Sequence, residues 1–311
     1  MTKEDLIEVH HRIEPHIHNT PILTSTLINE IVGADVFFKC ENFQKMGAFK
    51  MRGATNAIMQ LTNAQKSRGV VTHSSGNFAQ ALSLAAKSLG VTSFIVMPSS
   101  APQVKKDAVK AYGGKIIECE PTLTAREQAA KQIEQEEGAT FIHPSNDMHV
   151  ILGQGTAAKE LLEKQPDLDY IITPIGGGGL IAGTVLFARQ FGKNCKVIGG
   201  EPMEADDAFR SLQSGKIETN KTALTIADGL KTQLGDINFP IILEGVDQII
   251  RVSEEEIINA MRLLWERLKI VSEASSAVAL AALIKEKATF KNKKVGIIIS
   301  GGNVNLSNLP F

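Results

Sequence analysis

Short apolar runs that favour β-strands recur along this chain, and stretches with helical spacing separate most of them. The nine runs are VFFK (36–39), GVVTHS (69–74), SFIVMP (93–98), GKIIECE (114–120), TFIHP (140–144), YIITPI (170–175), KVIGGEP (196–202), QIIRV (248–252) and KVGIIIS (294–300). The clearest helical stretches are NFAQALSLAAKSLG, TAREQAAKQIEQEEG and SEEEIINAMRLLWERLKI. Strands that alternate with helices predict mostly parallel sheets of the α/β class.

Two sheets fit this pattern better than one. Nine strands are more than one small sheet needs, and 311 residues are enough for two domains. The strands between about residues 69 and 144 form one compact block. We therefore predict a small mobile domain over residues 66–145 and a large domain made of residues 1–65 and 146–311. Each would be a mostly parallel twisted sheet flanked by helices.

Charge and cysteine content argue against several classes of protein. The formal net charge is −1, so the chain lacks the basic excess that nucleic-acid binding usually needs. Its three cysteines, Cys40, Cys119 and Cys195, are far apart and predict neither a disulfide framework nor a metal cluster. The N-terminal stretch is charged and has no apolar run, unlike a signal peptide or membrane span. We expect a cytoplasmic protein that binds neither nucleic acid nor membranes.

Chemically unusual residues follow four of the predicted strands, at the edge where parallel sheets bind ligands. In GAFKMRGA, Lys50 and Arg52 fall in the first turn of a helix expected to start near Phe49, where the helix dipole disfavours cations. Most lysines are solvated surface groups, but a lysine here could instead form a Schiff base with a carbonyl cofactor.

Two further junctions carry serine, glycine and asparagine. Ser74 to Asn77 (SSGN) open a helix, and their hydroxyls and free N–H groups suit a carboxylate, although an ordinary N-cap would need only one such residue. Ser300 to Asn303 (SGGN) follow the last strand, and taken alone they indicate a simple turn.

The fourth junction is a run of glycines that links a strand to an apolar helix. Gly176, Gly177, Gly178 and Gly179 leave several N–H groups free to surround a phosphate. The lysine of a nucleotide P-loop is missing. A rival interpretation stays open, because Gly177, Gly179 and Ala182 match a loose dinucleotide pattern with Glu201 at the end of the next strand. That pattern would indicate an NAD-dependent oxidoreductase.

Taken in order, GAFKMRGA, SSGN, GGGGL and SGGN resemble the β-family (fold type II) of pyridoxal-phosphate enzymes, in its serine/threonine dehydratase and serine racemase branch. The resemblance runs from about Thr20 to Asn305. It implies that pyridoxal phosphate lies in the cleft between the two domains. The cofactor-binding residues that it implies are Lys50 for the covalent bond, Phe49 against the ring, Asn77 for the ring hydroxyl, Gly176 to Gly179 for the phosphate and Ser300 for the pyridine nitrogen.

The same resemblance implies three other features. Ser74, Ser75 and Gly76 would hold the substrate carboxylate. Glu201, Ala205 and Asp207 match the metal site of serine racemases, whose hard oxygen ligands suit Mg²⁺, or else Ca²⁺ or Mn²⁺. The protein would be a homodimer. Only six residues follow Asn305, so we expect no regulatory domain there.

Two positions depart from the family pattern. Phe78 stands where the family usually has His after SSGN, which changes the polarity beside the substrate. Asn305 stands where racemases often have Asp after SGGNV.

We expect Lys50 to remove the α-proton of an amino acid and Ser75 to act from the opposite face. The predicted activity is a threonine/serine dehydratase (ammonia-lyase). The alternatives are a serine racemase with side dehydratase activity and a 3-hydroxyaspartate dehydratase. A non-catalytic sensor on the same fold ranks last, because Lys50 is present.

Overall fold

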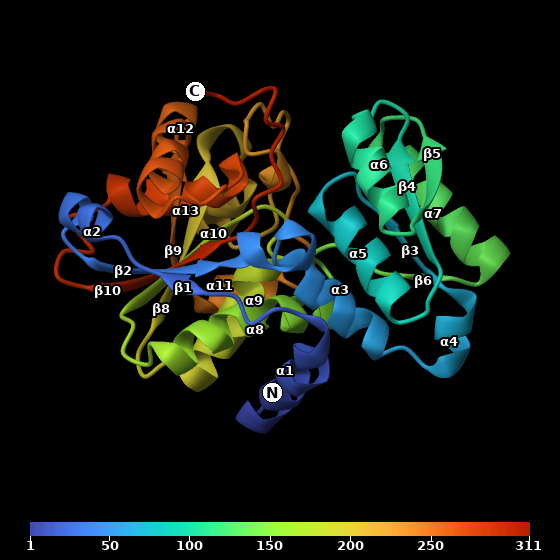
Figure 1. Cartoon of the computed structure of the whole chain (residues 1–311), viewed down its shortest axis with the longest axis horizontal. Helices are drawn as coiled ribbons and strands as arrows, with labels where there is room; N and C mark the ends of the chain where they lie inside the picture. The colour runs from blue at the N-terminus through green and yellow to red at the C-terminus, as the bar shows by residue number, and fades with distance from the viewer.

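The strands form two sheets in a computed structural model that describes all 311 residues (Figure 1). The larger sheet has the order β1-β2-β10-β7-β8-β9 and the smaller one β5-β4-β3-β6. Every pairing is parallel except that of β1 with β2. The strands are β1 Ile22–Leu23, β2 Asp35–Cys40, β3 Val70–His73, β4 Ser93–Pro98, β5 Lys115–Cys119, β6 Thr140–Phe141, β7 Tyr170–Pro174, β8 Lys196–Pro202, β9 Val246–Val252 and β10 Lys294–Ile299.

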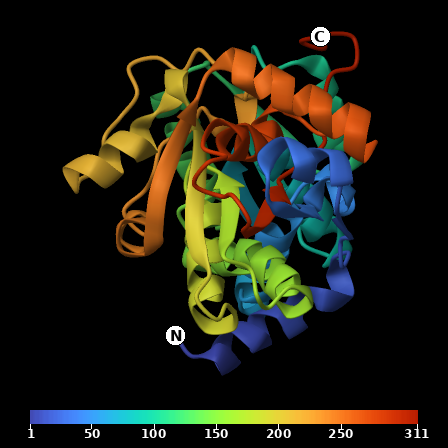
Figure 2. The ribbon, with the colours of Figure 1, turned by 90° about the vertical axis from the view of Figure 1, so that its left-hand side faces the viewer.

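Helices cover both faces of the larger sheet and surround the smaller one (Figures 1 and 2). They are α1 Lys3–Ile13, α2 Thr26–Val32, α3 Lys50–Met59, α4 Asn63–Arg68, α5 Asn77–Ser88, α6 Gln103–Ala111, α7 Leu123–Glu137, α8 Met148–Lys164, α9 Gly179–Phe191, α10 Asp207–Ser214, α11 Phe239–Gly245, α12 Glu254–Leu263 and α13 Ala274–Lys285. None of them combines the length and apolar character needed to cross a membrane.

The predicted α/β architecture with two mostly parallel sheets is confirmed, and each of the nine predicted runs contains a strand. The prediction missed β1, a two-residue strand that follows Pro21 and pairs with β2. The run 140–144 is only partly a strand, because β6 pairs with β3 only at Thr140 and Phe141. The smaller sheet lies between residues 70 and 141, and the domain boundaries at 66 and 145 stay a prediction.

Helix α3 lies between the two sheets in Figure 1 and packs closely on α8. Glycines at the crossing allow this contact. A Cβ on Gly153 of α8 would stand 2.5 Å from the Arg52 carbonyl oxygen, and one on Gly53 would stand 2.8 Å from the Val150 carbonyl oxygen. Since atoms cannot approach so closely, both positions need glycine. The helix that begins at Lys50 is therefore packed directly on the large-sheet side of the molecule.

Arg52 anchors the same helix from within the protein. Its side chain is fully buried and makes bidentate ion pairs with two carboxylates. The bonds to Glu41 are 2.7 and 2.9 Å long, and those to Glu160 of α8 are 2.7 and 2.8 Å. Lys39 of β2 is also buried and lies 2.6 Å from Glu160, so two cations balance two anions. We call Lys39, Glu41, Arg52 and Glu160 the buried ion cluster.

Replacing Arg52 by Met should strongly lower the free energy of unfolding. The change leaves two buried carboxylates with one cation, and breaking a buried pair typically costs about 3–5 kcal/mol. Chemical denaturation should show a decrease of that size in the free energy of unfolding. As a control, Arg189→Met removes an exposed arginine 3.3 Å from Glu244, and such pairs contribute about 0–1 kcal/mol. Equal losses in both variants would show that the buried ion cluster does not hold α3 in place.

Candidate active site

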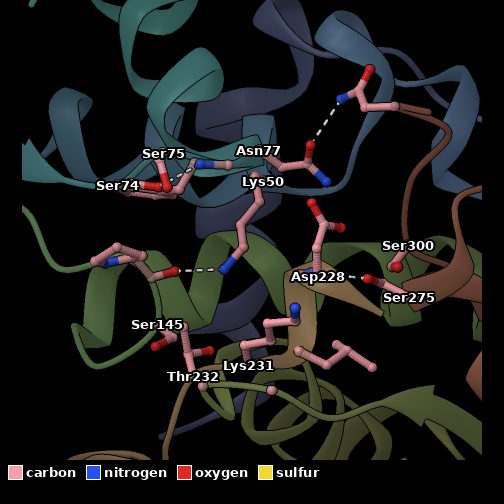
Figure 3. Close-up of a pocket in the computed structure, with 18 of the residues that line it drawn as sticks. Lys50, Ser74, Ser75, Asn77, Ser145, Asp228, Lys231, Thr232, Ser275 and Ser300 are labelled. Carbon is pink, nitrogen blue, oxygen red and sulfur yellow. Dashed lines mark hydrogen bonds between the residues drawn. The ribbon is translucent and has the colours of Figure 1, made fainter. Parts of the chain in front are cut away.

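A cleft of about 1160 Å³ lies between the two sheets and is lined by residues of both. All the residues predicted to bind cofactor or substrate line it. Figure 3 shows Lys50 pointing into this cleft, with Ser74, Ser75 and Asn77 on one side and Ser145 and Thr232 on the other. The three residues predicted to bind metal do not line it.

Lys50 is the first residue of α3, and its amine reaches the cleft. Nζ donates a 2.7 Å hydrogen bond to the Pro144 carbonyl and lies 5.0 and 5.7 Å from the ring centres of Phe49 and Phe78. Burial lowers the pKa of this amine to about 7, although the negative charge of Glu273 opposes the shift. A large share of the amine is therefore unprotonated near neutral pH, which is the form that attacks a carbonyl.

The glycine run forms a cradle without side chains between β7 and the start of α9. Gly178 has φ +80°, a conformation that favours glycine. A Cβ on Gly176 would stand 2.8 Å from Leu230 Cα, and one on Gly177 would collide with the Ser145 side chain. Backbone N–H groups at the N-terminus of α9 add a partial positive charge. The cradle therefore fits a phosphate group next to Lys50.

The SSGN segment forms the small-sheet wall of the cleft. Asn77 begins α5, and its Nδ2 donates to both carboxylate oxygens of Glu273 at 3.0 and 3.1 Å. Its Oδ1 accepts a 2.9 Å bond from Asn303 Nδ2. Around Gly76 there is open space, since a Cβ there would meet no atom within 4 Å. This part of the wall can admit a small polar group such as a substrate carboxylate.

Ser300 lies at the end of β10 and offers a neutral hydroxyl to the cleft. Its Oγ is 2.9 Å from Ser276 Oγ, and Ser276 also bonds both backbone groups of Gly301. Phe78, which replaces the usual histidine, is buried and presents its ring near Lys50. The departure from the family pattern therefore places an apolar ring near the Lys50 amine.

Sequence reasoning missed several residues of the cleft. Glu273 is the largest omission, because burial raises the pKa of its carboxyl to about 7 and it holds Asn77. It precedes α13 and looks in the sequence like an ordinary residue at a helix start. His143, Pro144 and Ser145 were also missed, since only the folded chain brings them to Lys50 and the glycine cradle.

The predicted metal ligands lie together at the end of β8. Glu201 accepts backbone N–H bonds from Ala208 and Phe209 at 2.9 and 2.8 Å, and Asp207 accepts a 2.6 Å bond from Asn220. Burial and the charge of Asp207 raise the pKa of Glu201 well above its usual value, and burial raises that of Asp207 to about 6.

Two buried carboxylates without a compensating cation are costly, so their oxygens suit a hard cation. No larger group of acidic, histidine or cysteine side chains gathers here. Because Glu201 lies outside the cleft, the structure gives no support to the ribose-binding role of the dinucleotide interpretation.

Comparisons with known proteins agree with this geometry. Residues 13–301 match the family described as "Pyridoxal-phosphate dependent enzyme". The chain is 50% identical to a beta-hydroxyaspartate dehydratase of Paracoccus denitrificans over 100% of its own length and 98% of that protein's. It is 51% identical to the serine racemase of Dictyostelium discoideum, covering 99% of this chain and 97% of that protein.

Solved structures show the same relationships. The crystal structure of the Dictyostelium serine racemase superposes with a TM-score of 0.94, over 98% of this chain and 99% of that one. The threonine deaminase of T.th. also gives a TM-score of 0.94, at 39% identity, over 99% of this chain and 100% of the other. The chain belongs to the fold type II pyridoxal-phosphate-dependent enzymes, in the branch of serine racemase, threonine dehydratase and hydroxyaspartate dehydratase.

Proposed function

We propose that this enzyme dehydrates a 3-hydroxy amino acid to a 2-oxo acid and ammonia, with 3-hydroxyaspartate as its preferred substrate. The observation that carries the proposal is the meeting of three groups in one cleft. These are the Lys50 amine with its lowered pKa, the glycine cradle for a phosphate, and the open polar wall at Ser74 to Gly76. The bound cofactor would supply an electron sink for the carbanion at Cα.

The residues of the chain supply binding and proton transfer. Lys50, once released from the cofactor, could take the α-proton in its unprotonated form, which the lowered pKa of this amine favours. Ser74, Ser75 and Gly76 would bind the substrate carboxylate through hydroxyl and N–H groups. Ser300 would offer a neutral hydroxyl to the pyridine nitrogen, which would leave that nitrogen unprotonated and favour loss of a β-hydroxyl.

Free cations in the cleft favour an acidic substrate over threonine or serine. Arg126 of α7 and Lys231 both line the cleft, and neither lies within ion-pair distance of a carboxylate. Lys105, by contrast, is 2.6 Å from Asp228. A second carboxylate on the substrate could therefore pair with Arg126 or Lys231 without displacing an existing partner. The hydroxyaspartate dehydratase among the relatives supports this choice.

Serine racemisation is the second candidate, and the identity to serine racemases supports it. It requires a proton donor on the face of the substrate opposite Lys50, and Ser75 would be that donor. A serine hydroxyl is a weak acid and needs polar neighbours. Phe78, three residues further along the chain, supplies an apolar ring where a histidine would be polar. We therefore expect dehydration to be faster than racemisation.

We also propose a divalent cation, Mg²⁺ in preference to Ca²⁺ or Mn²⁺, at Glu201, the Ala205 carbonyl and Asp207. One connection to the cleft supports a role for it. Asp207 accepts a 3.3 Å bond from the Leu234 N–H, and the segment before Leu234 lines the cleft. A cation at Asp207 would then help to order that segment.

The substrate should be recognised through its second carboxylate. We expect kcat/KM to be highest for 3-hydroxyaspartate in a panel with L-serine and L-threonine, measured as 2-oxo acid release. Arg126→Gln should lower the value for hydroxyaspartate about 10- to 100-fold, as loss of a charged hydrogen bond predicts, and leave that for L-serine within about threefold. Arg267→Gln, at an exposed position, is the control. Equal losses on both substrates would exclude Arg126 as the carboxylate's partner.

Removing the Ser75 hydroxyl should separate the two reactions. Ser75→Ala should abolish formation of D-serine from L-serine but keep much of the pyruvate release, because elimination needs no donor on the second face. Pyruvate and D-serine should be measured in the same reaction, in wild type and variant. Racemisation faster than pyruvate release in the wild type would make the racemase the main activity. D-serine formation that persists in Ser75→Ala would mean that another group is the donor.

The metal should stabilise the protein more strongly as pH rises. Because the pKa of Asp207 is raised, its ionised form destabilises the metal-free protein above about pH 6. Below about pH 6 the carboxyl is protonated and binds metal poorly. Mg²⁺ added to chelator-treated protein should therefore raise Tm more at about pH 7.5 than at about pH 5. Asp207→Asn should remove this pH-dependent rise, and Asp206→Asn, at a carboxylate paired with Arg210 and Arg251, should keep it. An unchanged rise in Asp207→Asn would place the ion elsewhere.

A further inference from the structure

The chain passes from the smaller to the larger sheet through a short irregular segment between β6 and α8. We call residues 143–146 the crossover turn. It lines the cleft through His143, Pro144 and Ser145. None of these residues belongs to the motifs of the four strand junctions, yet the turn contacts both Lys50 and the glycine cradle.

His143 holds this turn with one ring nitrogen. Its Nδ1 accepts the backbone N–H of Ser145 at 3.2 Å and that of Asn146 at 2.8 Å. A backbone N–H can only donate, so Nδ1 carries no proton and the neutral ring has its proton on Nε2. Burial, together with the positive charges of His73 and Lys50, lowers the pKa of His143 to about 4, and Asp236 opposes that shift only in part. The acceptor therefore persists at neutral pH.

The turn that His143 holds carries the acceptor for the lysine amine. The Pro144 carbonyl receives the 2.7 Å bond from Lys50 Nζ (Figure 3). It also receives a 3.3 Å bond from Gln154 Nε2. Proline has no N–H, and it restricts His143 to an extended backbone. The turn, together with the two backbone N–H bonds to His143 Nδ1, thus sets the orientation of the Pro144 carbonyl.

The same turn supports the glycine cradle. A Cβ on Gly177 would collide with the Ser145 side chain, and one on Gly179 would stand 2.5 Å from Gln154 Oε1 and 3.0 Å from Ser145 Cα. The Ser145 carbonyl accepts a 3.1 Å bond from Asn238 Nδ2, which also donates to the Gly177 carbonyl at 2.8 Å. A shift of the turn would therefore move the amine of Lys50 relative to the phosphate site.

We propose that His143 is a positioning residue, whose Nδ1 shapes the crossover turn so that the Pro144 carbonyl holds the Lys50 amine at the place where it bonds the cofactor and takes the α-proton. The inference rests on the proposed role of Lys50. It differs from an acid–base role for the imidazole, because it needs only an acceptor atom and not a group that exchanges a proton.

Two substitutions separate the acceptor from the ring. In His143→Asn, Oδ1 stands one bond beyond Cγ, as Nδ1 does, and an asparagine can accept the N–H groups two and three residues ahead. In His143→Phe, the aromatic ring remains to pack on His73 and Phe141, 5.9 and 6.2 Å away between ring centres, but the acceptor is lost. His149→Phe, at an exposed histidine of α8, controls for the exchange itself.

The rate at which pyridoxal phosphate bonds to cofactor-stripped full-length protein reports the placement of the amine without any substrate. We expect the visible band of the lysine-bound cofactor to form about 10- to 100-fold more slowly in His143→Phe, the range that a misplacement of about 1 Å can produce. His143→Asn should form it within about threefold of wild type. The kcat of the holoenzyme should follow the same order, with smaller changes in KM, and Tm should be recorded for each variant.

The outcomes decide between the roles. A normal rate in His143→Phe, or an equally slow rate in His143→Asn and His143→Phe, would overturn the proposal. If His143→Phe does not fold, His143→Leu, which also lacks the acceptor, takes its place and is expected to be slow in the same range. A wild-type protein whose band cannot be fixed to Lys50 by borohydride would instead refute the proposed role of Lys50, which separates the two failures.

Discussion

The bidentate pairing of Arg52 with Glu41 and Glu160 is the interaction on which the rest of the site depends. It joins the end of β2, helix α3 and helix α8, and it lies two residues from Lys50. Charges in a dry interior are tolerated only when they are balanced and fully bonded, and the buried ion cluster meets both conditions. The cluster fixes α3 from within the protein, whereas the Lys50 amine reaches the cleft, where burial lowers its pKa.

The cleft is completed by hydrogen bonds between the two sheets. Asn77 of α5 bonds Glu273 and Asn303, and Lys105 of α6 pairs with Asp228. These bonds are polar, and an apolar cluster beside them runs from α1 and α3 to α5 and the smaller sheet. The cofactor would lie among the polar bonds, so its binding would add contacts to both sides at once. The geometry of the site would thus depend on small local elements of the cleft, such as the crossover turn.

Regular elements and glycine-rich junctions could be predicted from the sequence because they depend on local pattern. Each predicted strand is present, and the predicted cofactor and substrate residues line one cleft. Contacts between distant residues could not be predicted. Lys50 and Arg52 look alike in the sequence as two cations in one helical turn, but Lys50 faces the cleft and Arg52 enters the interior. Only the fold shows that His143 Nδ1 accepts two backbone N–H bonds, which distinguishes His143 from an ordinary polar residue.

The order of strands in the larger sheet also determines how the chain can be assembled during synthesis. β10, the last strand made, lies between β2 and β7, and its residue Lys294 pairs with Asp35. The smaller sheet is formed from one continuous stretch, so it can fold as soon as residue 141 has left the ribosome. The larger sheet stays in two parts until its central strand arrives. Nascent chains therefore expose the apolar edge of β2 from residue 40 onward and that of β7 from residue 174 onward, until β10 is made. A deletion that removes β10 would leave these halves without a common partner.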